Sequence, residues 1–124
     1  MFTEKFFEVL KHEGAVSITS WGNDEPHVNC TWNSYLVAKG ENILLIPAAG
    51  MHSTEQDVAV NDKVILTLAT REVEGFNGYH GTGFRINGTA KFLVDGAYFD
   101  EMKKLFPFLR SVLQITVTNL KQLL

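Results

Sequence analysis

The chain is short of the residues that mark several classes of protein. Its single cysteine, Cys30, excludes an internal disulfide framework and a cysteine-rich zinc site. No stretch approaches the ~18 consecutive apolar residues that suggest a membrane span. Residues 1–5 contain no apolar run typical of a signal peptide. We therefore expect a cytoplasmic protein with no membrane partner.

Positive charge is also scarce. Lys and Arg number 11 against 14 Asp and Glu, which gives a formal net charge of −3. The basic residues form no cluster, whereas a nucleic-acid-binding surface needs Lys and Arg gathered on one face. The sequence therefore predicts no nucleic-acid partner.

The size and apolar content favour one folded domain. A chain of 124 residues is long enough for a single core, so we expect one domain over residues 1–124. Apolar residues make up 45% and charged residues 20%, as in globular rather than disordered chains. Aromatic residues reach 11% and include nine Phe, most of them expected in the core and some available for a flat ligand.

Local patterns predict a mainly β fold of the α+β class. Thr3 is placed to cap a first helix and Gly14 to end it. The apolar face of that helix consists of Phe2, Phe6, Val9 and Leu10. Strands are expected at 15–21, 27–36, 43–46, 64–70, 84–94 and 112–118, short helices at about 53–60 and 97–106, and a glycine-rich loop at 74–83. Antiparallel strands joined by hairpins suit a small barrel whose open ends the helices cover.

Residues 31–35, Thr-Trp-Asn-Ser-Tyr, combine two aromatic rings with three hydrogen-bonding side chains. On a strand, Trp32 and Ser34 would share one face and the other three residues the opposite face. This mixture suits a flat ligand with polar edges. The alternative is a tryptophan packed in the core beside polar surface residues.

A second candidate site is the start of the helix that follows the Pro-Ala-Ala-Gly turn at 47–50. Ser53 and Gln56 have the spacing of a capping box. Unpaired N–H groups and a partial positive charge make a helix start a ready site for an anion such as phosphate. The alternative is an ordinary helix cap.

Other candidate chemistry has little support. His52 and Glu55 lie three residues apart, as two metal ligands can, but no third or fourth donor accompanies them. Cys30 has no recognisable His partner, which favours a role as a buried apolar residue. The glycine-rich loop matches neither the dinucleotide nor the phosphate-loop spacing. We therefore expect no metal site and assign no catalytic residue.

Short motifs along most of the chain are together similar to one known family. They are Phe-Phe-Glu-Val-Leu-Lys at 6–11, Thr-Trp-Asn-Ser-Tyr-Leu at 31–36, Gly-Met-His at 50–52 with Thr-Glu at 54–55, Gly-Thr-Gly-Phe at 81–84, and Ile-Thr-Val at 115–117. Their order and spacing resemble the small FMN-binding proteins of sulfate-reducing bacteria, within the flavin-reductase and pyridoxamine-phosphate-oxidase-like split barrels. The resemblance implies a six-stranded antiparallel split β-barrel and a homodimer, with one FMN per subunit near the dimer interface.

The resemblance also implies cofactor contacts. Thr31 and Thr54 would hold the phosphate, and Tyr35 would stand near the ring. The residues that would line the ribityl chain and the isoalloxazine are Trp32, Asn33, Pro47, Ala48, Ala49 and Gly50. Glu13 and Leu124 would reach the flavin of the partner subunit.

Two further cofactor-binding positions depart from the family. Ser53 stands where the family has a lysine, and Cys30 stands where it has an asparagine, with Asn29 one place earlier. A hydroxyl donates to phosphate but does not neutralise it. Either FMN binds more weakly than in the family, or another cation such as Arg71 compensates.

The resemblance implies a redox protein, for which three roles stay open. The first is an electron carrier that works with a protein or small-molecule donor. The second is a flavin reductase or oxidase acting on NAD(P)H or another small substrate. The third is a non-catalytic module for another flat cofactor, such as haem or a deazaflavin. A short chain without a visible nicotinamide motif favours the carrier.

Overall fold

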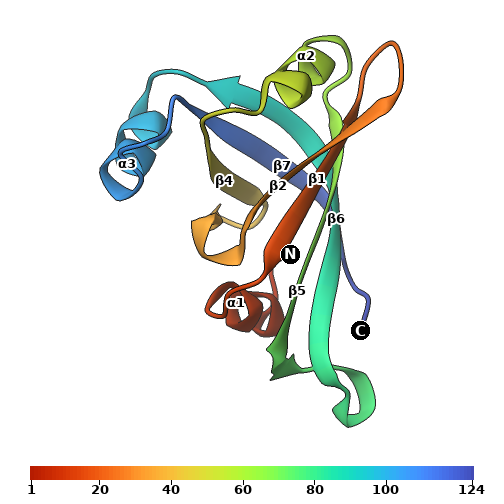
Figure 1. Ribbon diagram of the computed structural model, residues 1–124. Coiled ribbons are helices and arrows are strands. Elements are labelled where there is room, and N and C mark those ends of the chain that lie inside the picture. The colour runs from red at the N-terminus through yellow and green to blue at the C-terminus, as the bar shows by residue number, and fades with distance from the viewer.

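Seven strands form one antiparallel sheet in the computed structural model, which describes residues 1–124 (Figure 1). They are β1 (Ala15–Trp21), β2 (Pro26–Trp32), β3 (Val37–Lys39), β4 (Ile43–Ala48), β5 (Lys63–Glu74), β6 (His80–Leu93) and β7 (Ser111–Gln122). Their order across the sheet is β2-β1-β5-β6-β7-β4-β3. The predicted mainly β, α+β class is confirmed. The predicted number of six strands is wrong, because the short β3 pairs with β4 across the turn at Gly40.

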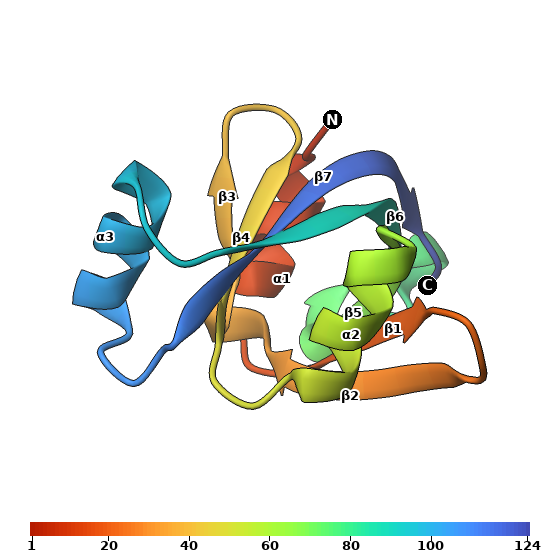
Figure 2. The same cartoon turned by 90° about the horizontal axis from the view of Figure 1, so that it is seen from above.

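The sheet curls into a barrel that stays open (Figure 2). Its edge strands β2 and β3 do not pair with each other, although they are consecutive in the chain. The 3-10 turn η1 (Asn33–Tyr35) joins them and crosses the split. The strand predicted at 27–36 is therefore wrong in its second half. The Asn33 N–H still donates to the Gly14 carbonyl oxygen at 2.9 Å, in register with the β1–β2 ladder, and the chain turns immediately afterwards, where the Leu36 N–H donates to the Asn33 carbonyl oxygen at 3.2 Å.

Helix α1 (Glu4–Leu10) contributes Phe6 and Val9 to the core, and both are fully buried. The Phe6 ring meets the Phe84 ring edge-on, with 5.5 Å between their centroids. Thr3 caps the helix as predicted, its hydroxyl oxygen accepting from the Phe6 N–H at 3.1 Å. The helix ends at Leu10, before the predicted Gly14.

Strand β4 is buried on both faces, as its apolar run predicts. Leu44 and Ile46 belong to the main core, while Leu45 packs into a second cluster with Met102, Leu109 and Val112. That second cluster lies under α3 (Ala97–Leu105). The strand continues through Pro47 to Ala48, beyond the predicted end. Proline is tolerated because the pairing with β3 stops at Leu45, which leaves β4 an edge from there on.

The glycine-rich loop predicted at 74–83 is mostly a long hairpin. Strand β5 runs to Glu74, the 3-10 turn η2 (Phe76–Gly78) follows, and β6 begins at His80. Gly83 lies inside β6, where a Cβ atom would be 2.8 Å from the Leu68 carbonyl oxygen. Close strand packing, rather than loop mobility, therefore requires this glycine. The bulge predicted at Gly88 is confirmed by a register shift against β7. None of the helices has the length and apolar character needed to cross a membrane.

Candidate functional site

A groove of about 280 Å³ opens where the end of β2, η1 and the turn after β4 meet. We call it the split groove. Its lining residues are Asn29, Cys30, Thr31, Trp32, Tyr35, Pro47, Ala49, Gly50, Met51 and Phe108. Seven of the residues expected from the sequence are therefore brought together: Cys30, Thr31, Trp32, Tyr35, Pro47, Ala49 and Gly50.

Aromatic side chains form part of the split groove. Trp32 is 48% exposed, and Phe108 is 51% exposed. The rings of Tyr35, Phe106 and Phe108 form a triangle, in which the Tyr35 centroid lies 5.1 Å from that of Phe106 and 5.6 Å from that of Phe108. Exposed rings beside small residues suit a flat ligand. Cys30 is exposed here as well, so its predicted role as a buried apolar residue is wrong.

Phe108, Met51 and Asn29 are groove residues that sequence reasoning did not assign. Phe108 follows α3, more than 70 positions after Tyr35, and reaches it because β7 pairs with β4. The Phe-Pro-Phe sequence at 106–108 marks a helix end but does not reveal this contact. Met51 and Asn29 flank predicted positions, so only the fold distinguishes them from other neighbours.

Three of the expected residues, Asn33, Ala48 and Thr54, are instead buried in the chain and do not line the groove. Ala48 belongs to the core. Asn33 is fully buried, and its Nδ2 donates to the carbonyl oxygens of His12 at 3.0 Å and Ala69 at 3.1 Å. Its Oδ1 has no partner. In this fold Asn33 fixes η1 and thereby holds Trp32 and Tyr35 on either side of it.

The start of α2 (His52–Val60) presents donors at one end of the split groove. Met51 is the N-cap residue and no side chain caps the helix, so the predicted Ser53–Gln56 capping box is wrong. The first-turn N–H groups are therefore available to an anion. Thr54 is fully buried, and its hydroxyl oxygen accepts from Asn29 Nδ2. Thr54 anchors the helix start, and the half-buried Ser53 offers the accessible hydroxyl.

Glu13 and Leu124 lie outside the groove of their own chain. Glu13 accepts from the Ser34 hydroxyl at 2.7 Å and the Ser34 N–H at 3.1 Å, and these bonds lower its pKa. It is therefore ionised beside η1. The Leu124 carbonyl oxygen accepts from Thr82 Oγ1 and from Gln122 Nε2, each at 2.8 Å. Their expected contact with a partner's flavin stays a prediction.

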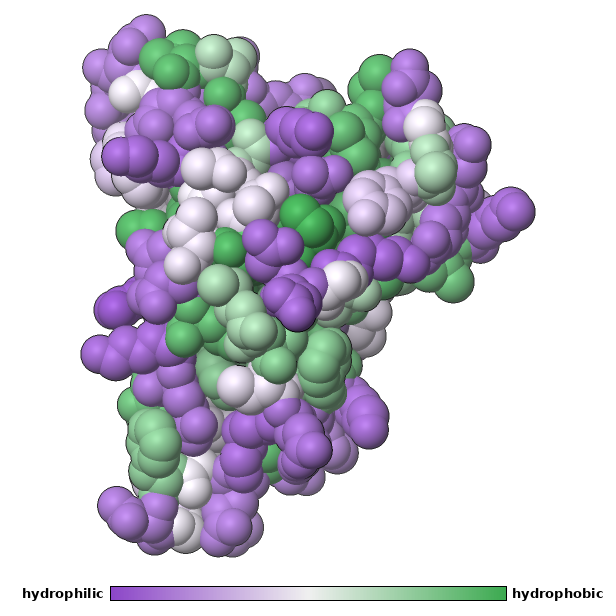
Figure 3. Space-filling model, turned by 180° about the vertical axis from the view of Figure 1, so that it is seen from behind, coloured by the Kyte–Doolittle hydropathy of each residue, from purple (hydrophilic) through white to green (hydrophobic).

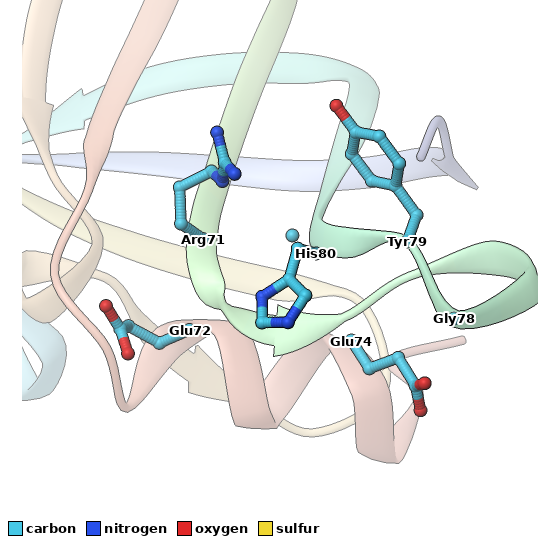
Figure 4. A pocket seen from close by; sticks show the side chains of 7 residues that line it. Arg71, Glu72, Glu74, Gly78, Tyr79 and His80 are labelled. Carbon is cyan, nitrogen blue, oxygen red and sulfur yellow. The ribbon is translucent and has the colours of Figure 1, made fainter.

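A larger cavity of about 560 Å³ lies at the tip of the β5–β6 hairpin, around its connecting turn (Figure 4). It is lined by Arg71, Glu72, Glu74, Gly78, Tyr79, His80 and Gly81. Its two glutamates would repel an anionic ligand such as phosphate, and Tyr79 is its only aromatic side chain apart from the His80 imidazole. The split groove is therefore the better candidate although it is smaller. Arg71 belongs to the larger cavity, so within one chain it is not placed to replace the missing lysine.

A charged cluster joins α2 to the β1–β2 hairpin. The buried Asp57 carboxylate accepts from Ser20 Oγ at 2.8 Å, and its Oδ2 lies 2.8 Å from His27 Nδ1. The hydrogen bond with His27 is the main cause of the lowered pKa of Asp57, and it raises the pKa of His27. Donor atoms of Asp24, His27 and Asp57 lie within 4.8 Å of one another, which is close enough for a metal ion. The satisfied Asp57 carboxylate favours an ion pair.

This ion pair predicts a pH-dependent stability. Because its pKa is raised in the folded protein, His27 contributes to the free energy of unfolding. This contribution is complete below the ordinary pKa of about 6.5 and is lost as the pH rises through the raised pKa. Asp57, whose pKa is lowered, contributes to the free energy of unfolding above its ordinary pKa of about 3.8. This contribution is lost as the pH falls through the lowered pKa.

Urea denaturation of the wild type and His27→Gln checks the alkaline side. At about pH 5.5 the free energy of unfolding of the wild type should exceed that of His27→Gln, and this difference between the two proteins should be smaller at about pH 9. A difference that stays constant over this range would contradict the ion pair.

Comparison with known proteins identifies the family to which the chain belongs. Residues 2–123 match the pyridoxamine 5'-phosphate oxidase family. The chain is 46% identical, over the whole length of both sequences, to a protein named FMN-binding protein from Nitratidesulfovibrio vulgaris (strain DSM 19637 / Miyazaki F).

Solved structures share the fold at low sequence identity. HupZ from Group A Streptococcus has a TM-score of 0.81 at 18% identity and covers 99% of this chain and 94% of its own. An FMN-binding protein from Syntrophomonas wolfei subsp. wolfei has a TM-score of 0.75 at 17% identity, and the match covers 98% of this chain and 85% of that protein's chain. The extent of these matches, above all the end-to-end one, shows that the chain belongs to the pyridoxamine 5'-phosphate oxidase family.

Proposed function

We propose that the split groove binds FMN and that the protein is an FMN-dependent electron carrier. The observation that carries the proposal is the groove itself, which joins exposed aromatic rings to an uncapped helix start. The exposed aromatic rings suit the flat ring system of a flavin, and the uncapped helix start suits its phosphate. The relative that is 46% identical over its whole length bears the name FMN-binding protein, which supports this choice of cofactor.

Each part of FMN has matching residues in the groove or at the helix start beside it. Trp32, Tyr35 and Phe108 would contact the ring system. The turn from Pro47 to Gly50 would follow the ribityl chain. Thr31, Ser53 and the first-turn N–H groups of α2 would donate to the phosphate. When bound, FMN supplies transfer of one or two electrons, while the chain orients it and keeps water from part of its surface.

We further propose that a second copy of the chain completes the site. The groove volume of about 280 Å³ lies just below the roughly 300–1,000 Å³ of small-molecule sites. One chain therefore encloses only part of a flavin. Apolar side chains gather in the middle of the face seen in Figure 3, flanked by polar regions. Such a surface suits contact with another protein, and Glu13 and Leu124 would reach the flavin of the partner subunit across this contact.

Glu13 gives this arrangement a testable electrostatic effect. Its carboxylate is ionised, so near a flavin it would oppose the gain of negative charge on reduction. We expect Glu13→Gln to raise the midpoint potential by roughly tens of millivolts. A redox titration of both proteins measures the shift. Glu41→Gln, in the exposed β3–β4 turn, is the matched control and should leave the potential unchanged. An unchanged or lowered value in Glu13→Gln would contradict the proposal.

The alternative is an enzyme, a flavin reductase or oxidase acting on NAD(P)H or another small substrate, and the name of the family, which is that of an oxidase, favours keeping it. NADH oxidation by the FMN-loaded protein separates the two roles. For a carrier, the rate should not exceed that of the same concentration of free FMN. NADH oxidation that is saturable and faster than with free FMN would contradict the carrier role and indicate a flavin reductase. The absorption spectrum of the purified protein distinguishes haem or a deazaflavin from FMN.

A further inference from the structure

Helix α2 is held on the sheet by polar side chains. Its two buried residues are Thr54 and Asp57, and its C-cap residue Asn61 donates from Nδ2 to the Trp21 carbonyl oxygen at 3.0 Å. Spacings of three and four residues put all three on one helix face. A surface helix usually presents an apolar stripe to the core instead. Val58 is only partly buried against the main core, so directed hydrogen bonds from the buried polar side chains contribute most of what fixes the position of α2.

The opposing residues come from one face of β2. His27, Asn29 and Thr31 alternate along the strand and so point to the same side. Asn29 bonds to Thr54, and His27 bonds to Asp57 one helical turn further on. Thr31, the next residue of this face, lines the split groove. The two contacts thus form a ladder that leads from the β1–β2 hairpin to the groove.

Asp57 is the most strongly held part of the ladder. Its side chain is 6% exposed, and Ser20, which donates to it, is fully buried. A buried carboxylate that loses such donors is costly, so α2 is expected to keep this position. The ring end of the groove is built differently, because Trp32, Tyr35 and Phe108 belong to β2, η1 and the segment after α3.

We propose that Asp57 is a positioning residue for phosphate recognition: by fixing α2 it places the first helical turn at the groove and confers selectivity for FMN over riboflavin. The inference rests on the proposed function. Asp57 does not line the groove, so its effect passes through the helix. Displacement of α2 would weaken contacts with the phosphate and leave the ring contacts in place.

Fluorescence titrations with FMN and with riboflavin test this proposal. We expect Asp57→Ala to weaken FMN binding about tenfold, the equivalent of one hydrogen bond to a charged group, and to change riboflavin binding less than about twofold. Asp57→Asn should restore most of the FMN affinity, because its amide oxygen can still accept from Ser20 and His27.

Two further variants separate positioning from general destabilisation. Gln56→Ala is the matched control, because its exposed side chain on α2 makes no hydrogen bond to the sheet, and it should leave the ratio of FMN to riboflavin affinity unchanged. Ser20→Ala removes one donor to Asp57 and should lower that ratio less than Asp57→Ala does. It provides the test if Asp57→Ala does not fold.

The outcomes keep the two proposals distinct. An unchanged affinity ratio in the folded Asp57 and Ser20 variants would overturn the positioning role, as would equal weakening of both flavins. A wild-type protein that binds neither flavin would instead contradict the proposed function.

Discussion

Trp32→Ala is expected to weaken FMN binding roughly 30- to 150-fold. Trp32 is 48% exposed in the split groove, so a bound ring would cover a large part of its surface. Covering about 100 Å² of apolar surface, together with ring stacking, corresponds to about 2–3 kcal/mol of binding free energy. Titration by flavin fluorescence measures the loss.

The same variant should barely affect folding, because the indole is already half exposed. We expect the free energy of unfolding without FMN to change by no more than about 1 kcal/mol. Trp32→Phe should recover much of the affinity. Phe76→Ala removes an exposed aromatic ring outside the groove and is the matched control. Wild-type FMN affinity in Trp32→Ala would place the flavin elsewhere.

Asn33→Ala is expected to lower the free energy of unfolding by about 2–4 kcal/mol. The substitution leaves the carbonyl oxygens of His12 and Ala69 without their amide donor. It also frees η1, so Trp32 and Tyr35 lose their fixed separation and FMN binding weakens as well. Urea denaturation without the cofactor isolates the first effect.

Asn42→Ala is the matched control for this prediction. Asn42 is exposed just before β4, and only its backbone carbonyl oxygen takes part in a hydrogen bond, with the Val117 N–H. Its substitution should change the free energy of unfolding by no more than about 0.5 kcal/mol. If Asn33→Ala is equally mild, the interpretation of Asn33 as the residue that fixes η1 is wrong.

Much of the fold follows from local patterns. The β-branched run from Ala15 to Trp21 predicts β1 with its bounds, and the apolar run at 43–46 predicts a strand buried on both faces. Errors fall where long-range contacts override local preference. Trp32 ends β2 because Asn33 bonds to segments distant in sequence, and β5 and β6 extend because each provides the other's partner.

The site is only partly predictable for the same reason. The motif at 31–36 and the turn at 47–50 are each one continuous segment, so both can be recognised in the sequence. Six of their residues meet in the groove: Thr31, Trp32, Tyr35, Pro47, Ala49 and Gly50. Buried Asn33 belongs to the first of these segments and buried Thr54 lies four residues after the second, and only packing distinguishes them from groove residues. Phe108 lacks a local signal, because its contact with Tyr35 depends on sheet topology.

FMN binding is the central claim, and titration of the flavin-free protein with FMN tests it most directly. The groove predicts saturable binding of one FMN per chain, with flavin fluorescence quenched by the aromatic side chains around it. FMN that keeps its free fluorescence and separates from the protein on gel filtration would contradict it.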